Sequence, residues 1–214
     1  MREVAIHRAG TDTSSAGGWE VIKNDSTVTY DLLALQNGVF AELGVAPVPA
    51  GSYTQTRLKL SPGSTVVVGG VTHALEVPSG LQSGYKLVGG FDVPAGGFVD
   101  LLIDFDARKS ITVTGNGRYQ LKPTTRIAVS AEAGAITGSI DPDDVPTRVC
   151  AVLGADSVQC VTTGAGGKFN LVALPPGSYT VAFDAPAGWR DTTLAAGVTA
   201  GSVTSLGAVA LTPQ

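Results

Sequence analysis

Hydrophobic and polar residues alternate with a period of two along most of the chain, and no long stretch shows the 3.6-residue period of an amphipathic helix. Period-two alternation is typical of strands with one buried face. The pattern therefore predicts an all-β protein. In the first part of the chain it predicts strands at residues 3–8, 19–22, 53–60, 65–68, 71–77, 86–93, 98–106, 110–114 and 126–132. Residues 30–35 remain ambiguous, because one helical turn fits them equally well.

A second series of short strands begins near residue 134. Their spacing matches a small Greek-key sandwich. We therefore expect two consecutive antiparallel β-sandwich domains, residues 1–133 and residues 134–214. The predicted strands of the second domain are residues 136–140, 147–153, 158–163, 169–174, 179–184, 192–198 and 203–211.

One turn phrase occurs three times, at residues 49–53, 94–98 and 176–179. Each copy has proline, then glycine, then an aromatic residue that opens a predicted strand. Proline and glycine supply the backbone angles of a tight turn. We expect each aromatic residue to anchor the first inward position of its strand, as a tyrosine corner does in sandwich folds.

The composition narrows the class of protein. Charged residues make up only 15% of the 214 residues, the net charge is −4, and no basic patch is visible, so a nucleic-acid partner is not expected. No apolar run approaches the length of a membrane span. No catalytic signature emerges, and we expect a protein that is not an enzyme and has no cofactor, with calcium as an alternative.

The start of the chain has no apolar signal region. Either the protein is cytosolic, or an export segment is absent from the given chain. Low charge, scarce lysine and abundant threonine, serine and glycine favour the second interpretation and an extracellular or cell-surface location.

The two cysteines flank a predicted hairpin. A three-residue tip places Cys150 and Cys160 opposite each other, within disulfide reach. A four-residue tip places them on opposite faces. The pair is thus a disulfide candidate, with two buried thiols as the alternative.

Five aspartates are weak candidates for a metal site. Asp104 and Asp106 share one face of a predicted strand, where paired carboxylates could bind calcium or be neutralised by nearby basic residues. Asp141, Asp143 and Asp144 form an acidic loop, but the glycine and closing glutamate of an EF-hand are missing, which favours a solvated turn.

The aromatic and histidine residues suggest other sites. Trp19 and Trp189 could stack on sugars, although packing is the commoner fate of tryptophan. His7 and His73 are isolated in the sequence, and His73 alternates with apolar residues as a packed histidine would. The glycine-rich stretch 164–168 lacks the spacing of a phosphate loop and is predicted to be a hairpin tip.

Several phrases in the first region resemble a family of bacterial surface lipoproteins whose domain has no known function. They are residues 31–33, 48–58, 77–84, 104–110 and 119–123. The resemblance implies a lipoprotein signal and an additional first strand, which this chain lacks. It therefore implies an unpaired edge on the strand that contains Val4.

The second region resembles the carboxypeptidase regulatory-like domain, which is a transthyretin-like sandwich. The matching residues are 136–140, 162–163, 167–171 and 174–181. This resemblance implies a fold and no activity.

Together these features predict a structural or adhesive surface component without enzymatic activity, whose partners are other surface proteins or copies of itself. Strand complementation at an open edge is one way in which such a protein assembles. A glycan- or ligand-binding module of a surface lipoprotein is the alternative.

Overall fold

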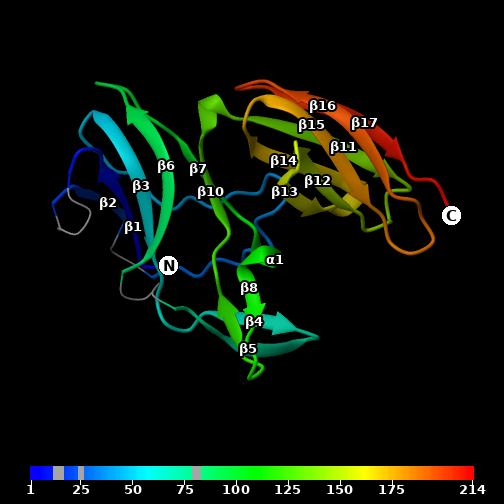
Figure 1. Cartoon of the computed structure of the whole chain (residues 1–214), viewed down its shortest axis with the longest axis horizontal. Coiled ribbons are helices and arrows are strands. Elements are labelled where there is room, and N and C mark those ends of the chain that lie inside the picture. The colour runs from blue at the N-terminus through cyan, green and yellow to red at the C-terminus, as the bar shows by residue number, and fades with distance from the viewer. Residues whose placement is uncertain (12–16, 24–26, 79–82) are drawn as a thin grey trace. The chain divides into compact units, whose positions relative to one another are not determined.

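The computed structural model describes residues 1–11, 17–23, 27–78 and 83–214 (Figure 1). Strands dominate the described residues, which confirms the all-β prediction. The chain divides into two compact units. Unit 1 comprises Met1–Leu32, Ala41–Val99 and Ile103–Ile127, and unit 2 comprises Leu33–Phe40, Asp100–Leu102 and Ala128–Gln214. The domain boundary expected between residues 133 and 134 stays a prediction.

The first sheet of unit 1 has the order β2-β1-β3-β6. Its strands are β1 (Glu3–Arg8), β2 (Trp19–Lys23), β3 (Gly51–Lys59) and β6 (Tyr85–Val93). β1 pairs with β2 on one side and with β3 on the other. The unpaired edge expected at Val4 is therefore wrong, because β2 folds back along one side of β1 while β3 takes the other.

The second sheet has the order β4-β5-β9-β8. Its strands are β4 (Thr65–Val68), β5 (Val71–Glu76), β9 (Tyr119–Leu121) and β8 (Ile111–Val113). The three-residue β9 was missed by the pattern because it is too short to show alternation. The helical turn α1 (Ala107–Ser110) was missed as well. Two further strands, β7 (Leu101–Phe105) and β10 (Thr125–Val129), pair with each other.

Unit 2 has two sheets, with orders β14-β11-β17 and β13-β12-β15-β16. Their strands are β11 (Gly134–Asp141), β12 (Arg148–Leu153), β13 (Asp156–Thr162), β14 (Lys168–Leu174), β15 (Gly177–Asp184), β16 (Thr192–Val198) and β17 (Val203–Ala210). Short 3₁₀ turns lie at Ser130–Glu132 and Ala165–Gly167. β11 and β17 are parallel, a departure from the antiparallel pattern expected.

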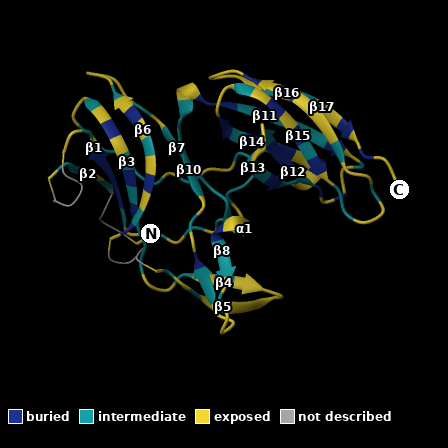
Figure 2. Ribbon diagram, in the orientation of Figure 1, coloured by how far each residue is buried: buried dark blue, intermediate teal, exposed yellow. Residues whose placement is uncertain are grey.

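The core of unit 2 is one continuous apolar cluster, contributed by both sheets (Figure 2). Ile136 comes from β11, Leu171 from β14, and Val149, Val181 and Phe183 come from the facing sheet, and all five are fully buried. Every second residue of β15 faces this cluster, from Tyr179 to Phe183. The apolar residues that alternate with polar ones along β15 therefore all lie in one buried layer.

Two of the three turn phrases form the expected anchor. Tyr53 and Tyr179 are buried, and each hydroxyl donates a 2.8 Å hydrogen bond to a proline carbonyl four residues earlier, Pro49 and Pro175 respectively. The third anchor is wrong, because Phe98 is 83% exposed. Phenylalanine has no hydroxyl with which to close the corner.

Candidate functional site

The strand β4 lies at the end of its sheet. Within the described residues it pairs with β5 alone, through a hairpin whose turn is Gly69-Gly70. In a two-residue hairpin the residues that flank the turn form a hydrogen-bonded pair, here Val68 and Val71. The peptide groups of Thr65 and Val67 consequently point away from β5, where a further strand can pair with them.

The β4–β5 hairpin is apolar and exposed. Val67, Val68 and Val71 are 63%, 43% and 57% exposed, and Figure 2 shows both strands largely in the exposed colour. Residues 61–75 contain no aspartate, glutamate, lysine or arginine. Edge strands of monomeric proteins are commonly protected by charge, proline or a bulge. β4 is short, but it has none of these within its four residues.

A signal for this edge was present in the sequence. The uncharged run from Ser61 to Leu75 could have been identified as a sheet edge without charged protection. What could not be identified was the place of β4 in the sheet, because the order of strands depends on the parallel pairing of β5 with the distant β9.

Trp19 lies in a polar cluster on the first sheet of unit 1. Its ring contacts His7 edge-on at 4.8 Å, and the Arg57 guanidinium lies 4.1 Å from the ring centroid. Arg57 and Lys59 also reach the carboxylate of Glu3, at 3.2 and 2.9 Å. One face of the indole is thus occupied by a cation, which stabilises the sheet surface by a cation–π interaction. The sugar-stacking prediction for Trp19 gains no support from this packing.

Trp189 lies in unit 2 and packs against the edge of its core. It also forms an isolated bridge with Pro213 near the end of the chain. Its side chain is half-buried, and sugar stacking at Trp189 stays a prediction. His73 is half-buried too, and its ring lies 4.9 Å from that of Tyr119.

The carboxylates of Asp104 and Asp106 have structural partners. Asp104 forms an ion pair with Arg126 at 3.2 Å. Asp106 caps α1 by accepting a 3.0 Å hydrogen bond from the Lys109 backbone N–H. Asp106 also forms an ion pair with the Lys109 Nζ at 3.5 Å, so each carboxylate has a basic partner and the two have separate roles.

The acidic loop lies beside a hollow in unit 2. This hollow has a volume of about 320 Å³ and is lined by Asp143 and Asp144 on one side and by residues 163–166 on the other. Asp141 ends β11 and precedes the loop. Among the described residues, no group of three or more histidine, cysteine, aspartate or glutamate side chains is placed to hold a metal ion.

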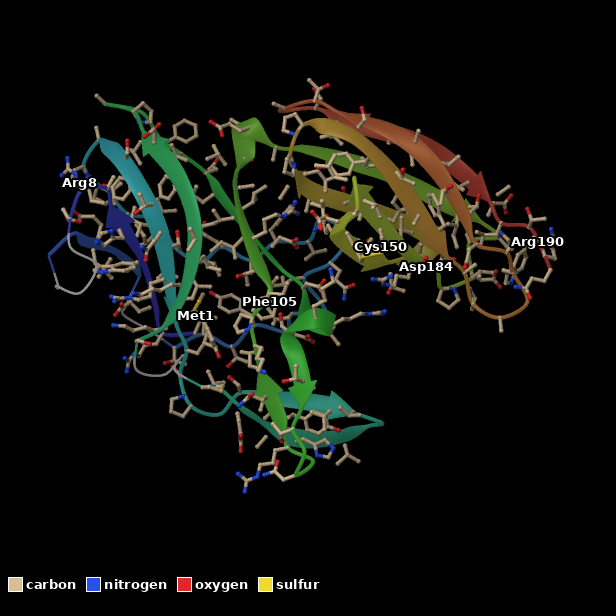
Figure 3. The ribbon with its side chains drawn as sticks, in the orientation of Figure 1. Met1, Arg8, Phe105, Cys150, Asp184 and Arg190 are labelled. Atoms are coloured by element: carbon tan, nitrogen blue, oxygen red, sulfur yellow. A yellow bond between two sulfur atoms is a disulfide. The ribbon has the colours of Figure 1, made fainter. Side chains whose placement is uncertain are left out.

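Cys150 and Cys160 are joined by a disulfide between β12 and β13, with Cα atoms 4.1 Å apart (Figure 3). Neither tip length considered for this hairpin occurs. The tip has two residues, because Leu153 of β12 pairs with Asp156 of β13. If that register continued without a shift, Cys150 would pair with residue 159. A bulge after Ala151 shifts the register by one residue and brings the two cysteines opposite each other.

The disulfide has a charged neighbour. Arg148 lies with its Nη2 atom 3.0 Å from the Cys160 Sγ, and its Nη1 atom donates a 2.6 Å hydrogen bond to Asp184. Asp184 is therefore the residue that holds the guanidinium against the sulfur. The Ser157 hydroxyl lies 3.1 Å from the same sulfur.

Two tyrosines of unit 1 have raised pKa values. Burial raises the pKa of Tyr53 above its usual value of 10.0, and the negative charge of Glu20 raises it further. Burial also raises the pKa of Tyr85, whose hydroxyl donates a hydrogen bond to the Leu121 carbonyl at 3.3 Å. Both groups stabilise the folded state in their neutral form.

Residues 1–123 match the family model described as a domain of unknown function (DUF4382). The match spans more than half of the chain, and the chain belongs to this family. Membership in a domain family of unknown function is thus confirmed, whereas the lipoprotein character stays a prediction. The comparisons give no support to a carboxypeptidase regulatory-like domain in residues 134–214, which also stays a prediction.

The solved structures that match this chain have low sequence identity and low TM-scores. The TIE protein of Bacillus anthracis is 17% identical with a TM-score of 0.31, and the match covers 77% of this chain and 34% of that protein. This chain thus spans about a third of that protein's length. The minor pilin GBS52 of Streptococcus agalactiae is 11% identical with a TM-score of 0.28, and coverage is 82% and 88%.

A streptococcal ancillary pilin is 10% identical with a TM-score of 0.29, over 99% of this chain and 61% of that one. At such TM-scores these likenesses carry no argument about function. No sequence among the curated proteins matches the chain. In the described part of the chain, no helix has the length and apolar character needed to cross a membrane.

Proposed function

We propose that this protein is a structural or adhesive component of a bacterial cell surface and joins its neighbours by strand addition at β4. The observation that supports this proposal most directly is the uncharged, exposed edge of β4, with Val67 and Val68 uncovered. An added strand would pair with the outward peptide groups of Thr65 and Val67 and would cover the adjacent valines. The occupant is a strand of another surface subunit or of a second copy.

The disulfide supports an extracytoplasmic location. Structural disulfides persist in oxidising compartments and are rare in reducing cytosol. Cys150 is buried beside the core of unit 2 and its bridge links two strands of one sheet, which is the setting of a structural disulfide. We therefore propose that the protein functions outside the cytoplasm.

The first test is the assembly state of the purified protein at rising concentration, followed by sedimentation velocity and negative-stain electron microscopy. We expect wild type to form dimers or longer assemblies. Val67→Lys should abolish them, because a lysine on the edge strand disfavours further pairing. Val67→Pro should also abolish them. Proline lacks the N–H that points away from β5, and its loss breaks no hydrogen bond between β4 and β5.

The matched control is Val45→Lys. Val45 is 83% exposed and lies outside the strands, so the same change of charge there should leave assembly intact. Wild type that remains monomeric at every soluble concentration, and that pairs with no surface protein from its source, would overturn the proposal.

A further inference from the structure

The two cysteines of the disulfide differ in exposure and in polar contacts. Cys150 is 4% exposed, whereas Cys160 is half-buried, so a reagent from solution reaches Cys160 more readily. Two polar side chains also contact Cys160: its Sγ lies 3.0 Å from the Arg148 Nη2 and 3.1 Å from the Ser157 hydroxyl oxygen. A cation and a hydroxyl group therefore converge on the more exposed cysteine of the pair.

Arg148 is placed to stabilise a negative charge on this sulfur. A guanidinium stays charged at every relevant pH, and a neighbouring cation favours the thiolate form of a cysteine over the thiol. The Ser157 hydroxyl can donate a hydrogen bond to the same thiolate. Asp184 holds the guanidinium through a 2.6 Å hydrogen bond to its Nη1 atom, which leaves Nη2 directed at the Cys160 Sγ. In a reduced chain, Cys160 is thus the cysteine with a stabilised thiolate.

The other charged residues of the surrounding strands do not oppose this effect. Within β12, β13, β15 and β16, which the structure describes completely, the charged residues are Arg148, Asp156 and Asp184. Asp184 is already paired with Arg148. Asp156 pairs with the last residue of β12, which alternation places on the face opposite Arg148. Lys168 opens β14 in the facing sheet, so the guanidinium is the charge in contact with Cys160.

Strand pairing keeps the two cysteines opposite each other independently of the bond between their sulfurs. β12 is held on its other side by β15, where Cys150 pairs with Ala182. β13 is held by Asn37, whose Nδ2 donates a 2.9 Å hydrogen bond to the Thr162 carbonyl at the end of the strand. Cys150 therefore lies within reach of the Cys160 sulfur in the reduced chain as well.

We propose that Cys160 is the reactive thiol of this protein and forms a mixed disulfide with small organic disulfides. The Cys160 thiolate attacks one sulfur of the organic disulfide R–S–S–R, forms Cys160–S–S–R and releases R–S⁻. Cys150 then loses its proton to solvent, and its thiolate attacks the Cys160 Sγ, closes the native bond and releases the second R–S⁻. The organic disulfide is the oxidant and takes up the two electrons. Arg148 and Ser157 are positioning residues, and the site is independent of β4.

The first test compares two full-length chains that each keep one thiol. Cys150→Ala leaves Cys160 free, and Cys160→Ala leaves Cys150 free. Each chain is mixed at neutral pH with dithiodipyridine, a neutral organic disulfide, and the released thiopyridone is followed by absorbance. We expect Cys160 to react at least about tenfold faster than Cys150. Equal rates, or a faster Cys150, would overturn the proposal.

The role of Arg148 is tested by the pH profile of alkylation, with iodoacetamide, in the Cys150→Ala chain. The midpoint of the rate against pH should lie below about 8.5, the value of an ordinary cysteine. Adding Arg148→Gln should raise the midpoint, and Arg148→Lys should restore part of the difference, because lysine keeps the charge. Arg190→Gln is the matched control, since Arg190 is exposed and lies apart from Cys150 (Figure 3). A midpoint that Arg148→Gln leaves unchanged contradicts the proposed role.

A second measurement needs no substitution and does not depend on the folding of any variant. The wild-type chain is reduced and treated at neutral pH with a limiting amount of iodoacetamide, and tandem mass spectrometry shows which cysteine carries the label. We expect the label mainly on Cys160 in the native chain. In urea, which removes the contact with Arg148, the preference should disappear. Equal labelling of Cys150 and Cys160 in the native chain would refute the assignment.

Discussion

Unit 1 and unit 2 are both built of strands, yet their interiors differ. Unit 2 has one continuous cluster in which Ile136, Leu171 and Phe183 are fully buried. The corresponding cluster in unit 1 consists of Val4, Leu58 and Leu87 with half-buried neighbours. Unit 1 adds ion pairs and a cation–π contact on a sheet surface. Two sheets that face each other bury more apolar area than several small sheets. We therefore expect unit 2 to have the larger free energy of unfolding, and to lose more of it when one of its core side chains is truncated.

The largest effect should come from truncation of the two cores. We expect Phe183→Ala to lower the free energy of unfolding of unit 2 by about 3–5 kcal/mol, because it leaves a large cavity in a fully packed layer. Leu87→Ala in unit 1 should cost about 2–3 kcal/mol, near the lower end of the usual range. Trp19 belongs to unit 1 and Trp189 to unit 2, so the same variants made in chains that keep only one of the two tryptophans report on each unit separately by fluorescence. Equal losses would remove the contrast between the cores.

Loss of the disulfide should rank next. The double variant Cys150→Ala/Cys160→Ala frees a short loop, and the chain-entropy model predicts a loss of about 2–3 kcal/mol. Guanidinium denaturation followed at Trp189 measures it. Because both cysteines belong to unit 2, the Trp19 transition should stay in place. A shift at Trp19 of similar size would contradict this assignment.

The tyrosine corners should contribute about equally in both units. Tyr53→Phe and Tyr179→Phe each remove one hydrogen bond to a proline carbonyl, with an expected cost of about 0.5–1.5 kcal/mol. Phe98→Ala is the control, because its exposed ring should contribute less than about 0.5 kcal/mol. Urea denaturation of the three variants provides the comparison. A costly Phe98→Ala would mean that the third phrase is an anchor after all.

The smallest effect should be a gradual loss of stability in alkaline solution, stronger in unit 1. The pKa values of Tyr53 and Tyr85 are raised in the folded state, so the folded state holds these protons more tightly than the unfolded state. Their stabilisation is complete below the unfolded value near 10.0 and is lost as the pH rises through the folded pKa. The Trp19 melting temperature, recorded against pH, measures it. Tyr53→Phe should flatten the decline, and an unchanged slope would contradict this origin.

Local chemistry made some elements predictable. The strands β1 and β16 have the bounds that the sequence pattern predicts, but four consecutive residues of β1, Val4 to His7, are buried, so alternation alone does not account for that strand. The corners at Tyr53 and Tyr179 follow from proline, glycine and a hydroxyl within five residues of each other. The acidic residues were harder, because the roles of Asp104 and Asp106 depend on Arg126 and on the start of α1.

The sequence by itself determined the strand character of the chain and the positions of its turns, because side-chain alternation and turn angles act over a few residues. Only the tertiary structure decided which strands are edges, where the register shifts to pair Cys150 with Cys160, and that Asn37 lies against β13 and β14. Strand order, bulges and contacts between distant segments depend on the packing of whole sheets. No short stretch of sequence carries that information, and the proposed assembly surface at β4 depends on it.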